Sequence, residues 1–121
     1  SPLTEQAESE LLADEPLKDQ IMAMRKMSGT VQSIMNLYSR KHAMDGVRID
    51  LKMAELEKEL KAAEKIPAVT GYDEELKNFQ SFLSTVKSFM NDMQKARSKG
   101  AYSDKEYQAM SEAYEYGLSV I

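Results

Sequence analysis

Three residues with hydrolytic chemistry, Ser39, His42 and Asp45, recur at intervals of three along the chain. On a helix this spacing places all three on one face. A serine nucleophile, however, needs an exposed turn with an oxyanion hole, and a serine inside a helix has no free backbone N–H groups beside it. The pattern is better explained as coincidence, and we predict a protein that is not an enzyme.

The candidate metal ligands fail on their spacing. Met22, Met24 and Met27 carry thioether sulfurs suited to copper, but Met22 and Met24 would project about 200° apart on a helix. The one histidine, His42, has no glutamate three residues before it, so the Glu-x-x-His motif of di-iron bundles is absent. The chain has no cysteine, which removes disulfides and thiolate zinc sites. The sequence therefore predicts no metal and no other cofactor.

Composition limits the classes of function. With 121 residues, 42% of them hydrophobic and 30% charged, the chain has the size and balance of one globular domain. It contains no long uncharged apolar run, so we expect no membrane span. The net charge of −4 argues against nucleic-acid binding, which depends on a basic face. We expect a soluble protein, either cytoplasmic in a bacterium or exported, and the missing initiator methionine is compatible with a removed targeting segment.

The element that positions most of these residues is a long helix predicted over residues 17–44. Its apolar residues form two neighbouring stripes that together cover roughly 200° of the helix. The first stripe contains Leu17, Ile21, Met24, Val31, Met35 and Tyr38, and the second contains Met27, Ile34, Leu37 and Met44. His42 continues the first stripe near the helix end, where a histidine commonly offsets the helix dipole; a pH-sensing role is a second interpretation.

Three further helices are predicted over residues 48–65, 72–99 and 103–120. The first has a narrow apolar seam between charged residues, which is typical of a coiled-coil-like helix, although Val47-Ile49-Leu51 also fits a short strand. The turn between it and the long helix is predicted at Asp45-Gly46, and a capping box precedes residue 107. Residues 1–16 form an acidic segment, partly ordered at best. We predict an all-α domain over 17–121, either an elongated antiparallel four-helix bundle or a pair of helical hairpins around one long central helix.

The width of the long apolar arc suggests a function in protein–protein interaction. If its three neighbouring helices cannot cover it, one side remains for another protein or a second copy of the chain, through helix packing. A methionine-rich surface also suits partner helices, although methionine commonly fills cores. We therefore predict a non-enzymatic interaction module, with a component, substrate or chaperone of a bacterial secretion apparatus as one setting. The alternative is a helical-bundle sensor that binds a small apolar ligand or a metal. The predicted partner-binding residues are Met27, Ile34, Leu37, Met44 and Tyr116.

Overall fold

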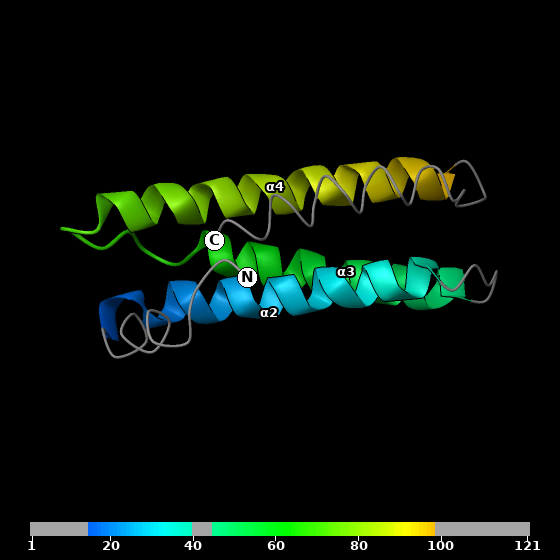
Figure 1. Ribbon diagram of the computed structural model, residues 1–121, viewed down its shortest axis with the longest axis horizontal. Coiled ribbons are helices and arrows are strands. Elements are labelled where there is room, and N and C mark those ends of the chain that lie inside the picture. Colours follow the sequence, from blue (N-terminus) through cyan, green and yellow to red (C-terminus); the bar gives the residue numbers. More distant parts are fainter. Residues whose placement is uncertain (1–14, 40–44, 99–121) are drawn as a thin grey trace.

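A computed structural model describes residues 15–39 and 45–98, and within these ranges the chain forms three helices (Figure 1). They are α2 (Glu15–Ser39), α3 (Asp45–Glu64) and α4 (Asp73–Ser98). No strand occurs in the described ranges, so the all-α fold class is confirmed. None of the three helices is long and apolar enough to cross a membrane.

The three helices lie side by side in an elongated, antiparallel arrangement (Figure 1). α3 runs back along α2 and packs against it most extensively, and α4 runs along both. Two ion pairs join α3 to α4 in antiparallel order, Asp50 with Arg97 and Glu64 with Lys87, at 3.0 Å each. The acidic segment up to residue 14, His42 and the helix predicted over 103–120 lie outside the described residues.

The predicted turn at Asp45-Gly46 is wrong, because both residues belong to the first turn of α3. Turns and helix N-termini favour the same residue types, since both leave backbone N–H groups to be satisfied locally. The alternative of a short strand at Val47-Ile49-Leu51 is also wrong, because these residues are part of α3. In a helix, residues two apart project about 200° from each other. Ile49 therefore points into the core, whereas Val47 and Leu51 point outward.

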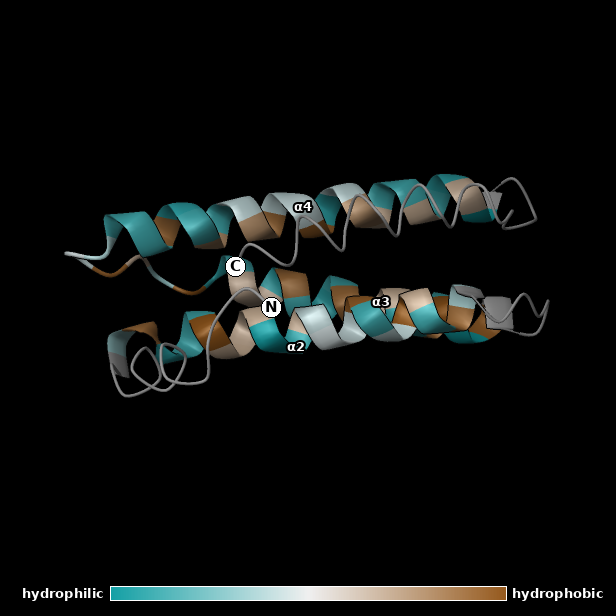
Figure 2. Cartoon of the chain, viewed as in Figure 1, coloured by the Kyte–Doolittle hydropathy of each residue, from teal (hydrophilic) through white to brown (hydrophobic). Residues whose placement is uncertain are grey.

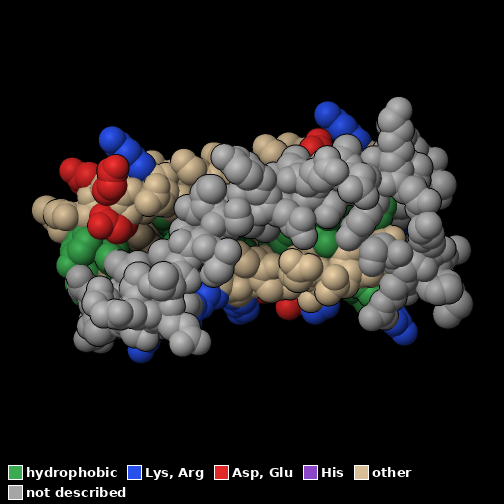
Figure 3. Space-filling model, viewed as in Figure 1, with side chains coloured by type: hydrophobic (Ala, Val, Ile, Leu, Met, Phe, Trp, Pro, Cys, Tyr) green, Lys and Arg blue, Asp and Glu red, His purple; other side chains and the backbone are tan. Residues whose placement is uncertain are grey.

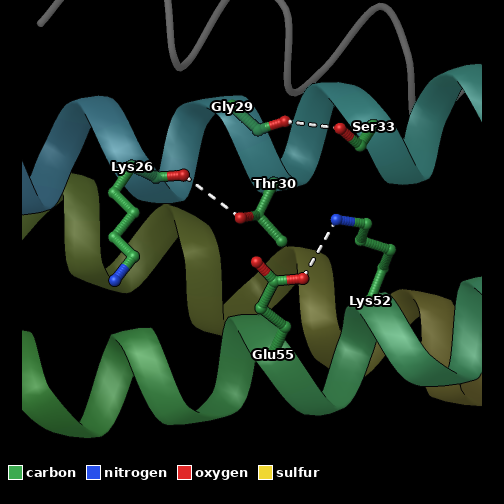
Figure 4. Close-up of polar contacts among 6 residues, drawn as sticks. All are labelled: Lys26, Gly29, Thr30, Ser33, Lys52 and Glu55. Carbon is green, nitrogen blue, oxygen red and sulfur yellow. Dashed lines mark hydrogen bonds and ion pairs between the residues drawn. The ribbon is translucent and has the colours of Figure 1, made fainter.

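α2 supplies one side of the core, and one of its two buried polar side chains bonds within the helix. Pro16 lies in the first turn, where its missing N–H costs nothing. Thr30 is only 6% exposed, and its hydroxyl donates to the carbonyl oxygen of Lys26 at 3.1 Å (Figure 4). Ser33 makes the same kind of bond to Gly29 at 3.0 Å. The buried apolar residues of α2 are Leu17, Ile21, Met27, Val31, Ile34, Met35 and Tyr38.

α4 is amphipathic along its whole length (Figure 2). Its hydrophobic side faces the other two helices, and all three phenylalanines of the protein, Phe79, Phe82 and Phe89, are buried there. Acidic residues fill its first turn and basic residues its last, which suits the helix dipole. Figure 3 shows the acidic side chains gathered where α4 begins. The preceding loop contains Gly71 at a φ of 91°, a conformation that favours glycine.

Candidate interaction surface

Two of the predicted partner-binding residues lie in the core of the domain. Met27 and Ile34 have 0% of their surface exposed and pack in one cluster with residues of α3 and α4. Leu37 is partly buried against the same cluster. The wide apolar arc of α2 is therefore used within the chain, and Met27 and Ile34 offer a partner no surface in this fold. Met44 and Tyr116 lie outside the described residues.

Exposed large hydrophobic residues occur instead on α3. Val47 is 62% exposed and Leu51 is 68% exposed, whereas Ile49 between them is 2% exposed. Ala54 is also exposed and follows Leu51 by three residues. Because residues three and four apart share a helical face, these three form one apolar patch that points away from the core. Met22 on α2, at 52% exposed, is the remaining large hydrophobic residue with this degree of exposure in the described ranges.

The same face of α3 continues with lysines. Lys58, Lys61 and Lys65 are all exposed and extend the spacing of the apolar patch in steps of four and three. Lys61 pairs with Glu57 at 3.2 Å, whereas Lys58 and Lys65 pair with no described residue. We define these six positions as the outer face of α3; five of them lie on the helix, and Lys65 lies in the turn directly after its end. They are Val47, Leu51, Ala54, Lys58, Lys61 and Lys65, apolar over the first half and basic over the second.

An open groove adjoins this face between α3 and α4. It has a volume of about 400 Å³, and Ala54 belongs both to the groove and to the outer face. Arg97 closes over Asp50 as a fork, since its Nε and Nη2 atoms donate to the two carboxylate oxygens at 3.0 to 3.2 Å. The groove therefore combines an apolar floor with a charged rim. Its lining residues are Asp50, Met53, Ala54, Glu57, Met93, Gln94 and Arg97.

The buried side of α3 carries one unusual polar residue. Glu59 is 8% exposed, and both of its carboxylate oxygens are buried without a hydrogen-bond partner among the described residues. It lies outside the groove. No three histidine, aspartate or glutamate side chains of the described ranges come together as a metal site. The features that the described residues present to solvent are the outer face of α3 and the groove beside it.

Residues 16–119 match the family described as DUF3829-like, C-terminal domain. The chain belongs to this family. The DUF3829-like domain is also similar to a solved structure described as an alpha helical protein from Bacteroides fragilis NCTC 9343, with 56% sequence identity and a TM-score of 0.83. That match covers 95% of this chain but only 45% of the relative, so the domain spans less than half of the relative's length. The comparison with curated proteins finds no match.

Sequence reasoning missed the outer face of this DUF3829-like domain although the signal is present. The steps of four and three from Val47 to Lys65 have the same period as the inner seam that begins at Ile49. The lysines in its second half resemble an ordinary solvated helix face, which hides the periodicity. The apolar seam already places Ile49 on the inner side of the helix, and this placement alone puts Val47 and Leu51 on the outer side.

Proposed function

We propose that this DUF3829-like domain is a non-enzymatic protein–protein interaction module that binds helical segments through the outer face of α3. The observation that supports this proposal is the exposure of two large aliphatic side chains, Val47 and Leu51, on one helical face. Burying a valine or leucine side chain completely contributes about 1.5–3 kcal/mol. Since each of the two is roughly two-thirds exposed, covering it with a partner contributes about two-thirds of that amount at each position.

The mode of binding follows from the shape of the surface. A partner helix laid along α3 would cover Val47 and Leu51 and place further apolar side chains over Ala54 and the adjoining groove. The chemistry required is burial of apolar area, and no bond is made or broken. The partner is another protein or a second copy of the chain. The bacterial secretion setting stays a prediction, which the genes neighbouring this one would test.

Sedimentation and dye binding test the interaction proposal. The purified protein should bind a dye specific for exposed apolar surface and should associate with a partner or with itself. Leu51→Ser should weaken both, whereas Met22→Ser should leave them unchanged, because Met22 is similarly exposed but lies on α2. A strictly monomeric protein that binds neither dye nor partner would contradict the proposal.

A second candidate function is binding of a small apolar ligand in the groove between α3 and α4. Its volume of about 400 Å³ is within the range of small-molecule sites, and Met53, Ala54 and Met93 provide an apolar lining. A thermal shift with apolar ligands or metal ions, in the absence of any protein partner, would favour this alternative. Ala54→Leu fills part of the groove without entering the core, so it should abolish a shift that arises there.

A further inference from the structure

We infer that this C-terminal domain is part of a longer protein, as in the relative, and that the outer face of α3 docks an amphipathic helix from the part that precedes the domain. The inference rests on the proposed interaction function and names the partner. The docked helix would carry apolar residues opposite Val47 and Leu51 and acidic residues opposite the lysines. Four observations support it: the spacing of the face, its charge, its size and the length of the relative.

The spacing indicates a helical partner. The six positions of the outer face follow one another at intervals of 4, 3, 4, 3 and 4, which is the heptad pattern by which two helices pack along each other. All six are exposed, and the five that lie on α3 run from Val47 near its start to Lys61 in its last turn, with Lys65 directly after the helix end. An extended peptide would match a period of two, and a loop would match no period.

The charge distribution specifies the chemistry of that helix. The second half of the face holds three lysines, and two of them, Lys58 and Lys65, have no ion-pair partner among the described residues. Lys61 is already paired with Glu57. A partner helix with aspartate or glutamate at matching positions would pair with Lys58 and Lys65, as e and g residues do in coiled coils. A second copy of the chain would bring the same lysines, so its charge would not complement the basic half of the outer face.

The size of the apolar patch favours a partner that is tethered. Stable interfaces between free proteins bury about 800 Å² on each partner, far more than Val47, Leu51 and Ala54 provide. A segment of the same polypeptide is present at an effective concentration in the millimolar range, so a weak contact is enough to keep it docked. The fourth observation is the length of the relative. This chain covers only 45% of it, and the matching family is a C-terminal domain, so a preceding segment is available as the tethered partner.

Site-specific photo-crosslinking in the full-length protein tests the inference. A photoreactive amino acid replaces Leu51, and a second variant carries it at Met22, which is also exposed but lies on α2. The Leu51 variant should form an intramolecular crosslink to a peptide that precedes this domain, with a yield independent of protein concentration. The Met22 variant should not form that crosslink. Circular dichroism should show that each variant keeps its helix content.

A charge-reversal pair tests the electrostatic half of the face. Lys58→Glu with Lys65→Glu should lower the crosslink yield from position 51 roughly fivefold, the equivalent of two exposed ion pairs. The control pair, Lys18→Glu with Lys77→Glu, makes the same change of net charge on α2 and α4 and should leave the yield unchanged. Equal yields in the two pairs would overturn the electrostatic argument.

Three crosslinking results would overturn the docking inference. They are a crosslink to a second copy that grows with protein concentration, a crosslink confined to residues 1–121, and a crosslink to lipid in place of protein when anionic vesicles are added. The first would leave the proposed interaction function standing, since the face would still bind protein. Absence of any crosslink together with negative sedimentation and dye results would contradict the inference and the proposed function alike.

Discussion

Replacing the buried, unpaired Glu59 with methionine should stabilise the domain. The side chain is 8% exposed, and neither carboxylate oxygen has a hydrogen-bond partner among the described residues. Leaving a buried polar group unsatisfied costs about 1–3 kcal/mol, and more when the group is charged. Methionine has a similar length and nearly the same helix propensity, but no polar atom to desolvate. We expect Glu59→Met to raise the free energy of unfolding by roughly 2 kcal/mol.

Urea unfolding followed by circular dichroism measures this change. Glu59→Gln removes the charge but keeps an unsatisfied amide, so its gain should be smaller than that of Glu59→Met. Glu55→Met and Glu57→Met are matched controls on the same helix, because both residues are exposed. Glu55→Met loses only the surface ion pair with Lys52, and Glu57→Met loses only the one with Lys61. The free energy of unfolding of each control should therefore change by less than about 1 kcal/mol.

The opposite result would refute the reasoning about Glu59. Breaking a buried ion pair by removing one partner costs about 3–5 kcal/mol. If Glu59→Met destabilised the protein by an amount in that range, and Glu59→Gln did so too, the carboxylate would have a charged partner in the folded protein. The buried face of α3 would then contain a polar contact essential to the fold, and Glu59 would have to be reinterpreted as half of a pair.

Four further substitutions test the fold in the same unfolding assay. Gly29→Ala should stabilise the protein by up to about 1 kcal/mol, because a Cβ there meets nothing within 4 Å in the middle of α2. Gly71→Ala should instead destabilise it by about 1 kcal/mol or more, because φ is 91° at this position; equal effects of the two would contradict the backbone argument. Phe89→Ala should cost about 3–5 kcal/mol, because the ring is 1% exposed, and a loss below 2 kcal/mol would place it outside the core. Arg97→Ala should cost less than about 1 kcal/mol, because its ion pair with Asp50 is half exposed.

The ends of the described helices could be predicted from the sequence to within about three residues, a usual uncertainty for helix ends, except that the helix predicted to residue 44 is described as α2 only as far as Ser39. Apolar residues at intervals of three and four identify each helix, and Pro67 limits the helix predicted over 48–65. The stripe from Phe79 to Met93 is buried as its period predicts. These features are local, because they depend on which residues share a helical face and on which residues end a helix.

Two of the predicted partner-binding residues, Met27 and Ile34, are buried in the core for a physical reason. The width of an apolar arc shows how much surface a helix must bury, but it does not show how many neighbours will bury it. α2 contacts both α3 and α4, so Met27 and Ile34 are covered within the chain. On α3, by contrast, the exposed patch is small and continues into lysines. Its significance depends on the tertiary fact that Ile49 faces the core.

α3 carries an inner seam and the outer face on opposite sides, with the same spacing of residues. The inner seam stabilises the fold, and the outer face is the proposed site of recognition. The inner seam, which contains Ile49, Met53, Leu56, Leu60 and Ala63, packs into the bundle. The outer face contributes little to the free energy of unfolding, because its side chains are already in contact with water in the folded domain. A change at Leu51 should therefore alter binding while leaving the domain folded, whereas a change at Leu56 should unfold it before binding can be measured. Because its inner face is packed into the bundle, α3 would offer the proposed partner a preorganised surface on its outer face.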